Sequence, residues 1–576
     1  MFIRIKDKST PEKYKKSVQI VHNVRDKGRV RQKILKHIGV ARDEGHLEEL
    51  RLLAQSIQIE LENGDASLFA PETLQKDLNA PHAHADPASS SLYEEEDYQV
   101  DIRSLEEEQR VIDGIHDVYG KLFDQLNLKS IFANPARNVS SVQTFKEILL
   151  ARIANPQSKR GSVAMLEEQF GVHLDLDKVY RMMDKLDDAA VEKLNALSPA
   201  KTKALFGDTI DVIYFDATTL YFESFTEDEG EDALKRNGYS KDLKFNQPQV
   251  VLALMVTKEG LPIGYEAFRG DTFDGHTLIP SLKALKKRYQ VDRIVYVADS
   301  GMFNQENLQE LETFEEGLID YIVGARIKNL SDALKTKILD TSHYTPLNAE
   351  ISVATFTLKN GRKLIVSHSK KRASKDKADR ERGIEKLRAK LSKTSSVKSQ
   401  LSHQGYKRYL KIENTHTQGD CTPSIVLNEE RIKADEAWDG LKGLMVNKDS
   451  QLSTEEILTQ YNNLWQVEES FRITKHDLKI RPIYHWKPNW VRAHIAISFA
   501  ALFLVRHLEH RVRLRYKKLS PQRIRQLLLS AQTSVLYSQT KKIRYALPST
   551  LQPETKKLYT IMELTRAQTP YIIEKD

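Results

Sequence analysis

The period of the apolar positions changes along the chain, and these changes mark out its elements. β-Branched and aromatic residues crowd into residues 210–222, 250–256 and 263–268, which predicts three consecutive strands. The elements predicted after them are a helix over 276–288, a strand over 294–298, a helix over 305–313 and a strand over 319–323. This β-β-β-α-β-α-β order predicts an α/β fold with a central mixed sheet flanked by helices.

The chain before this block is predicted to hold three segments. Residues 1–62 show strand-like alternation at 17–21 and then a helical pattern, which predicts a small strand-and-helix unit. Residues 63–103 carry prolines and an acidic run, so we expect a linker. Residues 104–207 are helical in pattern, and short helices such as 177–186 fit either a helix-turn-helix DNA reader or a plain helical bundle.

After residue 325 the predicted elements no longer follow this order, and the core is expected to resume at residue 450. A hairpin turning at Asn360-Gly361 and a basic helix over 375–393 are predicted first. Long helices over 454–475 and 489–515 follow. The divisions that we expect are a core over 208–325 and 450–505, an insertion over 326–449 and a basic C-terminal region over 506–576.

Composition limits the classes of protein that this chain fits. Hydrophobic residues make up 40% of the 576, which is enough for a sizeable core and excludes a wholly disordered chain. Cys421 is the only cysteine, so an internal disulfide and a cysteine-based zinc cluster are excluded, and a reducing, cytoplasmic setting is expected. The most apolar run, 495–505, is too short to span a bilayer and predicts a buried helix.

Positive charge gathers in three blocks, although the formal net charge is only +8. Residues 1–40 hold 12 Lys and Arg against three acids, residues 370–398 hold 12 against four, and residues 506–547 hold 11 against one. Such blocks fit a polyanionic partner, because each phosphate that is neutralised releases condensed counterions. Solvated helix faces explain any single block equally well, but three blocks together favour nucleic acid.

Two aspartates occupy positions in the predicted sheet that favour chemistry. Asp216 lies inside the first predicted strand, where a carboxylate is rare unless something pairs with it. Asp299 ends the strand over 294–298, and α/β sheets bind ligands at the carboxyl ends of their strands. The alternatives are a hydrogen-bonded core acid for Asp216, a turn-capping role for Asp299, and Asp211 as the strand acid in place of Asp216.

A third acid comes from the long helix over 454–475. Tyr461, Glu468 and Lys475 are spaced by seven, so they share one face with about 20° of drift per heptad. Apolar residues border this face, so we expect Glu468 to point toward the sheet, where burial without a partner would cost several kcal/mol. Three carboxylates without a cysteine ligand suit a hard cation such as Mg²⁺. Two such ions about 3.5–4 Å apart support phosphodiester chemistry without a covalent protein intermediate.

The three acids and their places resemble those of the DDE transposases, which have a ribonuclease H-like core. The helix signature of the insertion-sequence-four superfamily of bacterial transposases, Tyr-x2-Arg-x3-Glu-x6-Lys, is matched at Tyr461, Glu468 and Lys475. Its arginine position holds Leu464 in this chain. The sequence R-P-I-Y-H-W from Arg481 is similar to some branches of the same superfamily.

The resemblance implies a transposase that cuts the ends of an insertion sequence and transfers them to target DNA by a cut-and-paste route. It implies that Asp216, Asp299 and Glu468 bind two Mg²⁺ ions, for which Mn²⁺ can substitute. Tyr461 and Lys475 would contact phosphates at the transposon end. The implied partners are terminal inverted repeats, target DNA and a second copy of the chain in the synaptic complex, in the bacterial cytoplasm at the nucleoid.

Several alternatives stay open on the sequence alone. Arg472 and Arg481 are candidates to replace the missing signature arginine in holding a terminal phosphate. Trp465 and Trp486 are candidates for stacking on a flipped base, although core packing is the favoured prediction for both. The alternative functions are a ribonuclease H-like nuclease without strand transfer and an inactive, transposase-derived DNA-binding protein.

Overall fold

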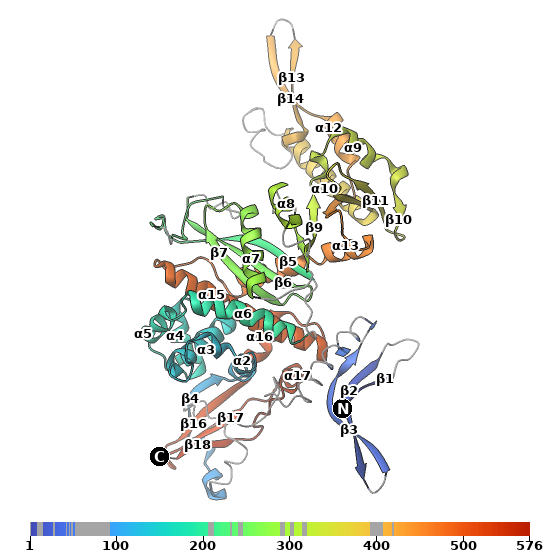
Figure 1. The fold of residues 1–576 in the computed structure, drawn as a ribbon. Helices are drawn as coiled ribbons and strands as arrows, with labels where there is room; N and C mark the ends of the chain where they lie inside the picture. Colours follow the sequence, from blue (N-terminus) through green and yellow to red (C-terminus); the bar gives the residue numbers. More distant parts are fainter. Residues whose placement is uncertain are drawn as a thin grey trace. The chain divides into compact units, whose positions relative to one another are not determined.

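The structure of the protein is a computed structural model, drawn in Figure 1, and it divides into two compact units. The larger unit comprises Met1–Ile294 and Leu464–Asp576, and the smaller unit comprises Val295–Asn463. The residues that the structure describes are 2–7, 15–26, 29–41, 43–44, 47, 50–51, 54, 93–205, 212–230, 233–239, 246–288, 294–299, 305–313, 319–391, 407–417 and 420–575.

Three antiparallel strands form the central sheet of the larger unit, β5 (Val212–Tyr221), β6 (Gln249–Thr257) and β7 (Pro262–Arg269). All of β6 is buried, and in β5 only Asp216 and Tyr221 are half-buried. A strand buried on both faces has a continuous apolar sequence, which explains the run VVLALMV in β6. The three strands predicted for this region are confirmed.

The remaining elements of the predicted core follow in the expected order. They are α7 (Leu278–Arg288), β8 (Ile294–Ala298), α8 (Gln305–Thr313) and β9 (Ile319–Ala325). The first segment of the larger unit ends at Ile294, so α7 belongs to the larger unit. From Val295 onward β8, α8 and β9 belong to the smaller unit. The predicted β-β-β-α-β-α-β order is confirmed along the chain.

A helical layer precedes this sheet in the larger unit. Its helices are α2 (Gly114–Gln125), α3 (Val139–Ala154), α4 (Lys159–Phe170), α5 (Leu176–Asp184) and α6 (Asp188–Lys203). The helical prediction is wrong at its start, where β4 (Leu105–Ile112) is a strand. Strand β4 pairs with β16 (Gln532–Ser538), a partner from the other end of the chain that no local pattern reveals.

The C-terminal region, predicted only as basic, is a folded sheet with helices. Its strand order is β18-β17-β16-β4, with β17 at Ile543–Pro548 and β18 at Tyr571–Lys575. Helices α16 (Pro521–Leu529) and α17 (Pro553–Ile561) belong to the same region.

A separate sheet lies at the N-terminus. It is formed by β1 (Phe2–Asp7), β2 (Lys16–Asp26) and β3 (Arg29–Ala41). The strand part of the predicted N-terminal unit is therefore confirmed. Of the helical pattern expected in this unit after the strand, over 46–61, the structure describes residues 47, 50, 51 and 54, which are helical, and most of the linker expected over 63–103 lies outside the described residues.

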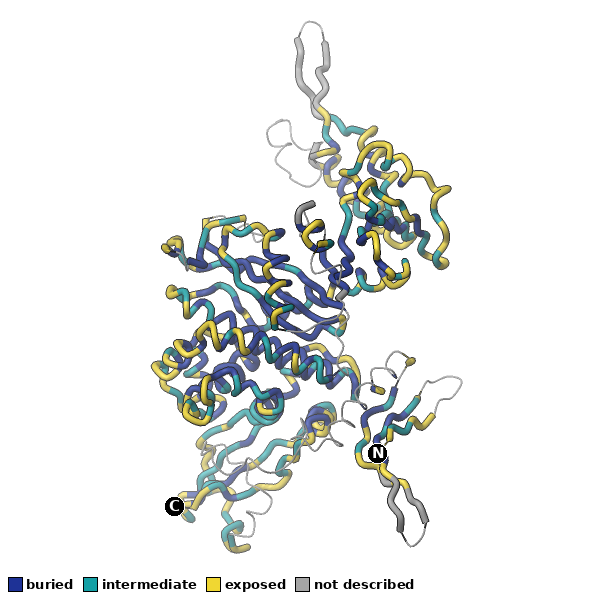
Figure 2. Tube along the Cα trace, in the orientation of Figure 1, coloured by how far each residue is buried: buried dark blue, intermediate teal, exposed yellow. Residues whose placement is uncertain are grey.

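Helix α15 (Pro488–Arg515) is the core of the larger unit. It packs on β7 and on helices α2, α3, α5 and α6, so it lies between the sheet and the helical layer. Its length and composition would allow it to cross a membrane, but 94% of its most apolar window is buried inside the protein (Figure 2). The predicted buried helix is confirmed.

The smaller unit carries a second group of strands, in the order β10-β11-β12-β15-β9-β8. Strands β10 (Thr345–Pro346), β11 (Ile351–Thr357), β12 (Lys363–Ser369) and β15 (Leu441–Val446) come from the predicted insertion. The hairpin predicted at Asn360-Gly361 joins β11 to β12, and Gly361 has a φ of 83°. Because β15 pairs with β9, the insertion extends the part of the core sheet that lies in this unit.

Helices and a hairpin complete the smaller unit. The helices are α9 (Asp332–Leu339), α10 (Lys370–Leu391), α12 (Glu429–Glu436) and α13 (Thr454–Asn462). Strands β13 (Leu410–Thr417) and β14 (Asp420–Leu427) form a two-stranded hairpin of their own.

The single helix predicted over 454–475 is wrong. Helix α13 ends at Asn462, α14 covers Trp465–Arg472, and a π-helical turn covers Ile473–Asp477. Asn463 has φ −82° and ψ 0°, outside the helical region, so the heptad argument cannot be carried across it. Hydrophobic spacing alone does not show such a one-residue break.

Buried Arg506 of α15 joins three elements of the larger unit. Its Nε donates to the carbonyl oxygen of Gly260 at 2.7 Å, and its Nη2 donates to Gln466 Oε1 of α14 at 2.9 Å. Its Nη1 donates to Glu509 Oε2 at 2.6 Å. Gly260 lies in the turn from β6 to β7 and has a φ of 81°. The turn, α14 and α15 are therefore joined through one guanidinium.

Replacing Gly260 by alanine tests this junction. A Cβ at this position would overlap Arg506 Nη2 and Gln466 Oε1, in a backbone conformation that alanine disfavours. We expect Gly260→Ala to lower the free energy of unfolding by about 2–4 kcal/mol, measured by urea denaturation. Gly230→Ala is the matched control, because Gly230 has a φ of 91° with no atom within 4 Å of the added Cβ, and should cost only about 1 kcal/mol. Equal losses for both variants would show that Arg506 is not a packing constraint.

Candidate active site

Asp216 is a half-buried acid in a strand that is otherwise buried up to Tyr221. Its Oδ1 accepts a hydrogen bond from the backbone N–H of Ala217 at 2.8 Å, which orients the carboxylate. Thr218 lies two residues further along β5, so the two side chains leave the same face of the strand. That face therefore presents a carboxylate beside a hydroxyl.

Helix α14 packs on β5 and β6 and carries Glu468 in the same unit as Asp216. Val467 and Ser470 of this helix are fully buried, whereas Glu468 is exposed. The prediction that Glu468 is buried is wrong, because the apolar face of α14 is centred to one side of it. Among the described residues Glu468 has no hydrogen-bond or ion-pair partner, so its oxygens are available to a ligand.

The π-helical turn after α14 brings Lys475 to the strand that bears Asp216. The Lys475 ammonium donates to Thr218 Oγ1. The turn is closed by a hydrogen bond of 2.9 Å from the N–H of Leu478 to the carbonyl oxygen of Ile473. Turns of this kind are rare and often occur at functional sites. Lys475 and Asp216 thus lie on one face of β5.

A hydroxyl is associated with the π-turn. Thr474 Oγ1 donates to the carbonyl oxygen of Ser470 at 2.7 Å. Ser and Thr side chains that bond backward in this way compete with the backbone and bend helices. This bond lies at the change from α- to π-helical hydrogen bonding, and a hydroxyl at this position is the signal in the sequence that could have indicated an irregular helix end.

Asp299 and Tyr461 form a pair in the smaller unit. Asp299 follows β8, as predicted, and is exposed. Tyr461 of α13 is buried, and its hydroxyl donates to Asp299 Oδ1 at 3.1 Å. The Lys442 ammonium lies 4.2 Å from the centroid of the Tyr461 ring. The hydroxyl expected to contact a phosphate is therefore engaged with a candidate metal ligand.

Arg472 is held by two carboxylates of its own unit. It donates to both oxygens of Glu469, at 2.7 and 2.8 Å, and its guanidinium lies 3.3 Å from Asp477 Oδ2. The hydrogen bond from Arg472 lowers the pKa of Glu469, and the same bond raises the pKa of Arg472. A phosphate would have to compete with both acids for this side chain.

Arg481 follows the π-turn and faces an aromatic ring. Its guanidinium lies 5.6 Å from the centroid of the Tyr221 ring at the end of β5, and burial lowers its pKa. Leu464, at the position of the signature arginine, is buried. The two candidate replacements therefore differ in their surroundings, which are an aromatic ring for Arg481 and two carboxylates for Arg472.

The prediction of core packing for two tryptophans is wrong. Trp465 is 42% exposed and Trp486 is 77% exposed. Trp465 begins α14, where the buried positions fall on the other side of the helix, and Trp486 lies in the segment before α15. Both indoles are available for stacking, and Lys518 Nζ lies 5.3 Å from the Trp465 ring centroid.

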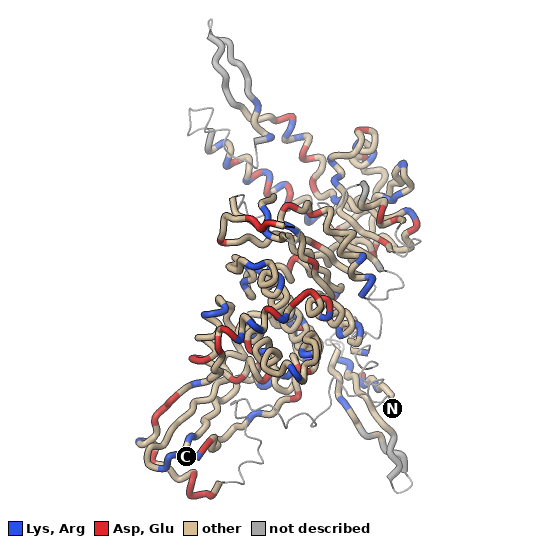
Figure 3. Tube along the Cα trace, turned by 60° about the vertical axis from the view of Figure 1, so that its left-hand side comes forward, with Lys and Arg blue, Asp and Glu red and all other residues tan. Residues whose placement is uncertain are grey.

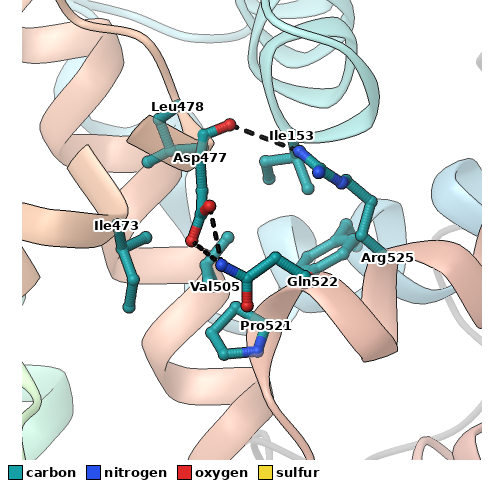
Figure 4. Close-up of a pocket in the computed structure, with 9 residues that line it drawn as sticks. Ile153, Ile473, Asp477, Leu478, Val505, Pro521, Gln522 and Arg525 are labelled. Atoms are coloured by element: carbon teal, nitrogen blue, oxygen red, sulfur yellow. Dashed lines mark hydrogen bonds between the residues drawn. The ribbon is translucent and has the colours of Figure 1, made fainter. Parts of the chain in front are cut away.

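A small pocket lies beneath the π-turn (Figure 4). It is lined by Tyr119, Ile153, Ile473, Asp477, Leu478, Val505, Pro521, Gln522 and Arg525. Gln522 donates to both oxygens of Asp477 at 2.7 Å, and Arg525 donates to its backbone carbonyl at 3.3 Å. None of the three candidate acids lines this pocket, so it supports the turn and is not a substrate site.

The donor chemistry of the three acids fits the Mg²⁺ that the resemblance implies. Glu468 and Asp299 are exposed and Asp216 is half-buried, and carboxylate oxygens are the ligands that Mg²⁺ prefers. Within either unit, the part of the chain that the structure describes holds no group of three Asp, Glu, His or Cys side chains placed to bind a metal. Each unit carries part of the donor set.

The Arg472–Glu469 pair makes a pH-dependent prediction. Because the pKa of Glu469 is lowered in the folded protein, the pair stabilises the fold above the unfolded pKa of about 4.3 and loses this effect as the pH falls through the folded pKa. Arg472→Met should lower the free energy of unfolding by about 0.5–1 kcal/mol at pH 7 and by less at pH 3.5, measured by urea denaturation. In a Glu469→Gln background the pH-dependent difference should disappear, and its persistence would assign the effect to Asp477.

Comparison with known proteins identifies the family. The family described as "Transposase DDE domain" matches residues 207–504, and "IS1634 family transposase, N-terminal domain" matches residues 3–67. No curated protein matches the chain. Among solved structures, the piggyBac transposase in a synaptic complex with hairpin DNA aligns over 72% of this chain and 77% of its own, with 10% identity and a TM-score of 0.36.

The first match covers more than half of the chain and contains the β-β-β-α-β-α-β core together with Asp216, Asp299 and Glu468. The predicted ribonuclease H-like fold class is confirmed with it. The chain belongs to the DDE transposases, and its residues 3–67 are similar to the N-terminal domain of IS1634 family transposases.

Proposed function

We propose that this protein is the transposase of an insertion sequence that binds the ends of its element, cuts them and joins the freed 3′ ends to target DNA by a cut-and-paste route. Membership of the DDE transposases supports the class of activity. The observation that carries the site is the π-turn, which holds Lys475 on the face of β5 that bears Asp216, directly after the helix of Glu468.

Asp216, Asp299 and Glu468 are the proposed metal ligands. Two Mg²⁺ ions, or Mn²⁺ in their place, would supply the Lewis-acid chemistry of phosphodiester hydrolysis and transesterification. The backbone N–H of Ala217 orients Asp216, and the hydroxyl of Tyr461 orients Asp299. Glu468 has no protein partner among the described residues, so ligand binding would break no existing contact there.

The proposed DNA contacts differ in how freely they are available. Lys475 would exchange its bond with Thr218 for a phosphate oxygen. Arg481 would take the role of the signature arginine, whose position in this chain is occupied by Leu464. Tyr461 is proposed to act mainly through the hydrogen bond from its hydroxyl to Asp299. Arg472, held by Glu469, is the least available of the four.

The proposed partners are the terminal inverted repeats and target DNA. Two ends are joined in one synaptic complex, which we propose contains a homodimer of this chain. The setting is the bacterial cytoplasm at the nucleoid, where a chain with a single cysteine needs no oxidising environment.

Glu468→Gln and Asp216→Asn test the metal ligands. An amide keeps the shape of the side chain but loses its charge, so cleavage should fall at least about 1000-fold, which corresponds to about 4 kcal/mol. Binding should change by less than about threefold. The measurement uses end-labelled DNA that carries the sequences flanking the reading frame, incubated with Mg²⁺ or Mn²⁺. Glu469→Gln is the control, since Glu469 already pairs with Arg472 and should leave cleavage near wild type.

The products of the same assay separate the alternatives. Cleavage without joined molecules would indicate a ribonuclease H-like nuclease that lacks strand transfer. Binding by wild type without any cleavage would indicate an inactive, transposase-derived DNA-binding protein. Equal loss of binding and cleavage in Glu468→Gln would argue against its role as a ligand.

Tyr461→Phe tests whether the hydroxyl acts on Asp299. Removing a partner of a metal ligand commonly weakens metal affinity by about 10-fold or more, so the Mg²⁺ concentration for half-maximal cleavage should rise by about that factor. Stabilisation of the free protein by Mn²⁺, followed by thermal denaturation, should weaken in parallel. Tyr409→Phe is the control, because its hydroxyl donates to Asp435 at 2.8 Å, away from the candidate ligands. If DNA binding weakened while the Mg²⁺ dependence stayed unchanged, the result would indicate that Tyr461 contacts a DNA phosphate instead.

A further inference from the structure

The three basic blocks of the sequence differ in how much of their charge remains available. In the block over 506–547, acids from other segments pair with three of the 11 basic residues: Glu554 pairs with Lys517 and Arg523, and Arg544 pairs with Glu108 and Glu574. The block over 1–40 falls partly outside the described residues. The block over 370–398 is described as far as Leu391, and this part forms helix α10 (Figure 3).

One face of α10 is buried in the smaller unit. Arg380, Ile384 and Leu387 are buried, and the two apolar residues pack in a cluster with Tyr409 and Ile432. Arg380 is paired with Asp439 at 2.5 Å and Glu436 at 3.6 Å, so this arginine is a structural residue. The buried face therefore leaves the opposite side of α10 to solvent.

The opposite side carries a row of basic residues, which we call the α10 basic row. Its members are Lys371, Lys375, Arg382 and Lys386, all exposed. At 100° per residue they fall within about 60° of one another and roughly opposite the buried Arg380. The row is about 22 Å long at 1.5 Å per residue.

The lysines of the α10 basic row are free of acid partners. Arg382 bonds to Asp379, but Lys371, Lys375 and Lys386 form no hydrogen bond or ion pair with any residue in the described part of the chain. Two acids flank the row: Asp379, which bonds to Arg382, and Glu385. Three ammonium groups in line that no acid of the described residues pairs with still favour a partner with regularly spaced negative charge.

We propose that the α10 basic row is a docking surface for the phosphate backbone of duplex DNA. Duplex DNA places one phosphate per 3.4 Å of axis on each strand, so the row is about as long as six base-pair steps along the duplex axis. Contacts of lysine to phosphate fix position but do not read bases, so the surface binds without regard to sequence. The proposal rests on the proposed transposase function, and it adds a DNA surface in the insertion, on an element other than the signature helix.

An anionic membrane is a poorer match for this row. Insertion into a membrane interface requires large apolar side chains on the same helix as the charges. The exposed residues of α10 are basic, acidic or small, and none of them is a large apolar side chain. Charge without an insertion face is typical of a nucleic-acid surface.

The test replaces the three free lysines together, as Lys371→Gln, Lys375→Gln and Lys386→Gln. Glutamine has nearly the same helix propensity, so the exposed helix should keep its fold, which circular dichroism melting checks. Binding is measured by fluorescence anisotropy at 50–300 mM NaCl with two 30-bp duplexes, one from the flanks of the reading frame and one unrelated. The magnitude of the slope of log K against log salt should fall by up to about 2.7, at 0.9 for each lost contact, equally for both duplexes.

Two further variants make the test specific. Lys337→Gln, Lys359→Gln and Lys433→Gln remove the same charge from exposed positions of the smaller unit, and the slope should change by less than about 1. A triple Lys-to-Arg variant of the row should keep the wild-type slope. The proposal would be overturned if the slope were unchanged in the glutamine variant, which is the result expected if the row binds an acidic protein. It would also be overturned if the control variant lowered the slope by the same amount.

Cleavage is scored separately on the flanking duplex with wild-type protein. Wild type that cleaves while the row variant keeps its slope defeats the docking surface alone. Wild type that does not cleave while the row variant loses slope defeats the transposase proposal and leaves the docking surface standing.

Discussion

The buried guanidinium of Arg506 constrains the part of the structure on which the candidate site depends. A charge removed from water is tolerated only when its donors find partners, and here each nitrogen has an acceptor on a different segment. Any displacement of α14 from the β6–β7 turn would leave that charge without Gln466 or without the carbonyl of Gly260. The helix that presents Glu468 is therefore fixed to the sheet through the cost of an unsatisfied buried cation, and packing of apolar side chains adds to it.

The segment after α14 is held in a similar way from the other side. Arg152 of α3 donates to the carbonyl oxygen of Leu478 at 2.8 Å, and Gln522 of α16 holds the carboxylate of Asp477. Helices α3 and α16, which are far apart in the sequence, thus both bind residues at the end of the π-turn. The helical layer, whose sequence suggested a possible DNA reader, also supports the position of Lys475, so substitutions within it can affect the site without touching DNA.

Much of the core was predictable because its strands are buried on both faces and its helices lie between turn residues. The positions of Asp216 and Asp299 in and after their strands were predictable because a carboxylate inside a strand, or at its end, stands out against an apolar background, and their role as metal ligands stays a prediction. The exposure of Glu468 was not predictable, because the break at Asn463 and the π-turn depend on single backbone angles and hydroxyl contacts that leave the apolar spacing unchanged. The pairing of β4 with β16 was hidden for another reason: its partner lies at the far end of the chain, and local patterns contain no information about it.

The π-turn changes what the distance between two letters of a sequence signature means. In a regular α-helix the seven-residue step from Glu468 to Lys475 would return almost to the same azimuth, but a turn closed five residues apart accommodates one residue more than an α-helical turn. A relative that kept a regular helix here would need its lysine one position earlier to reach the equivalent of Thr218. Two chains can therefore have the same spacing between the glutamate and the lysine but place the lysine differently in space. Two other chains can differ in this spacing by one residue and still place the lysine alike. An alignment that forbids a single-residue gap between the two positions would misjudge either case.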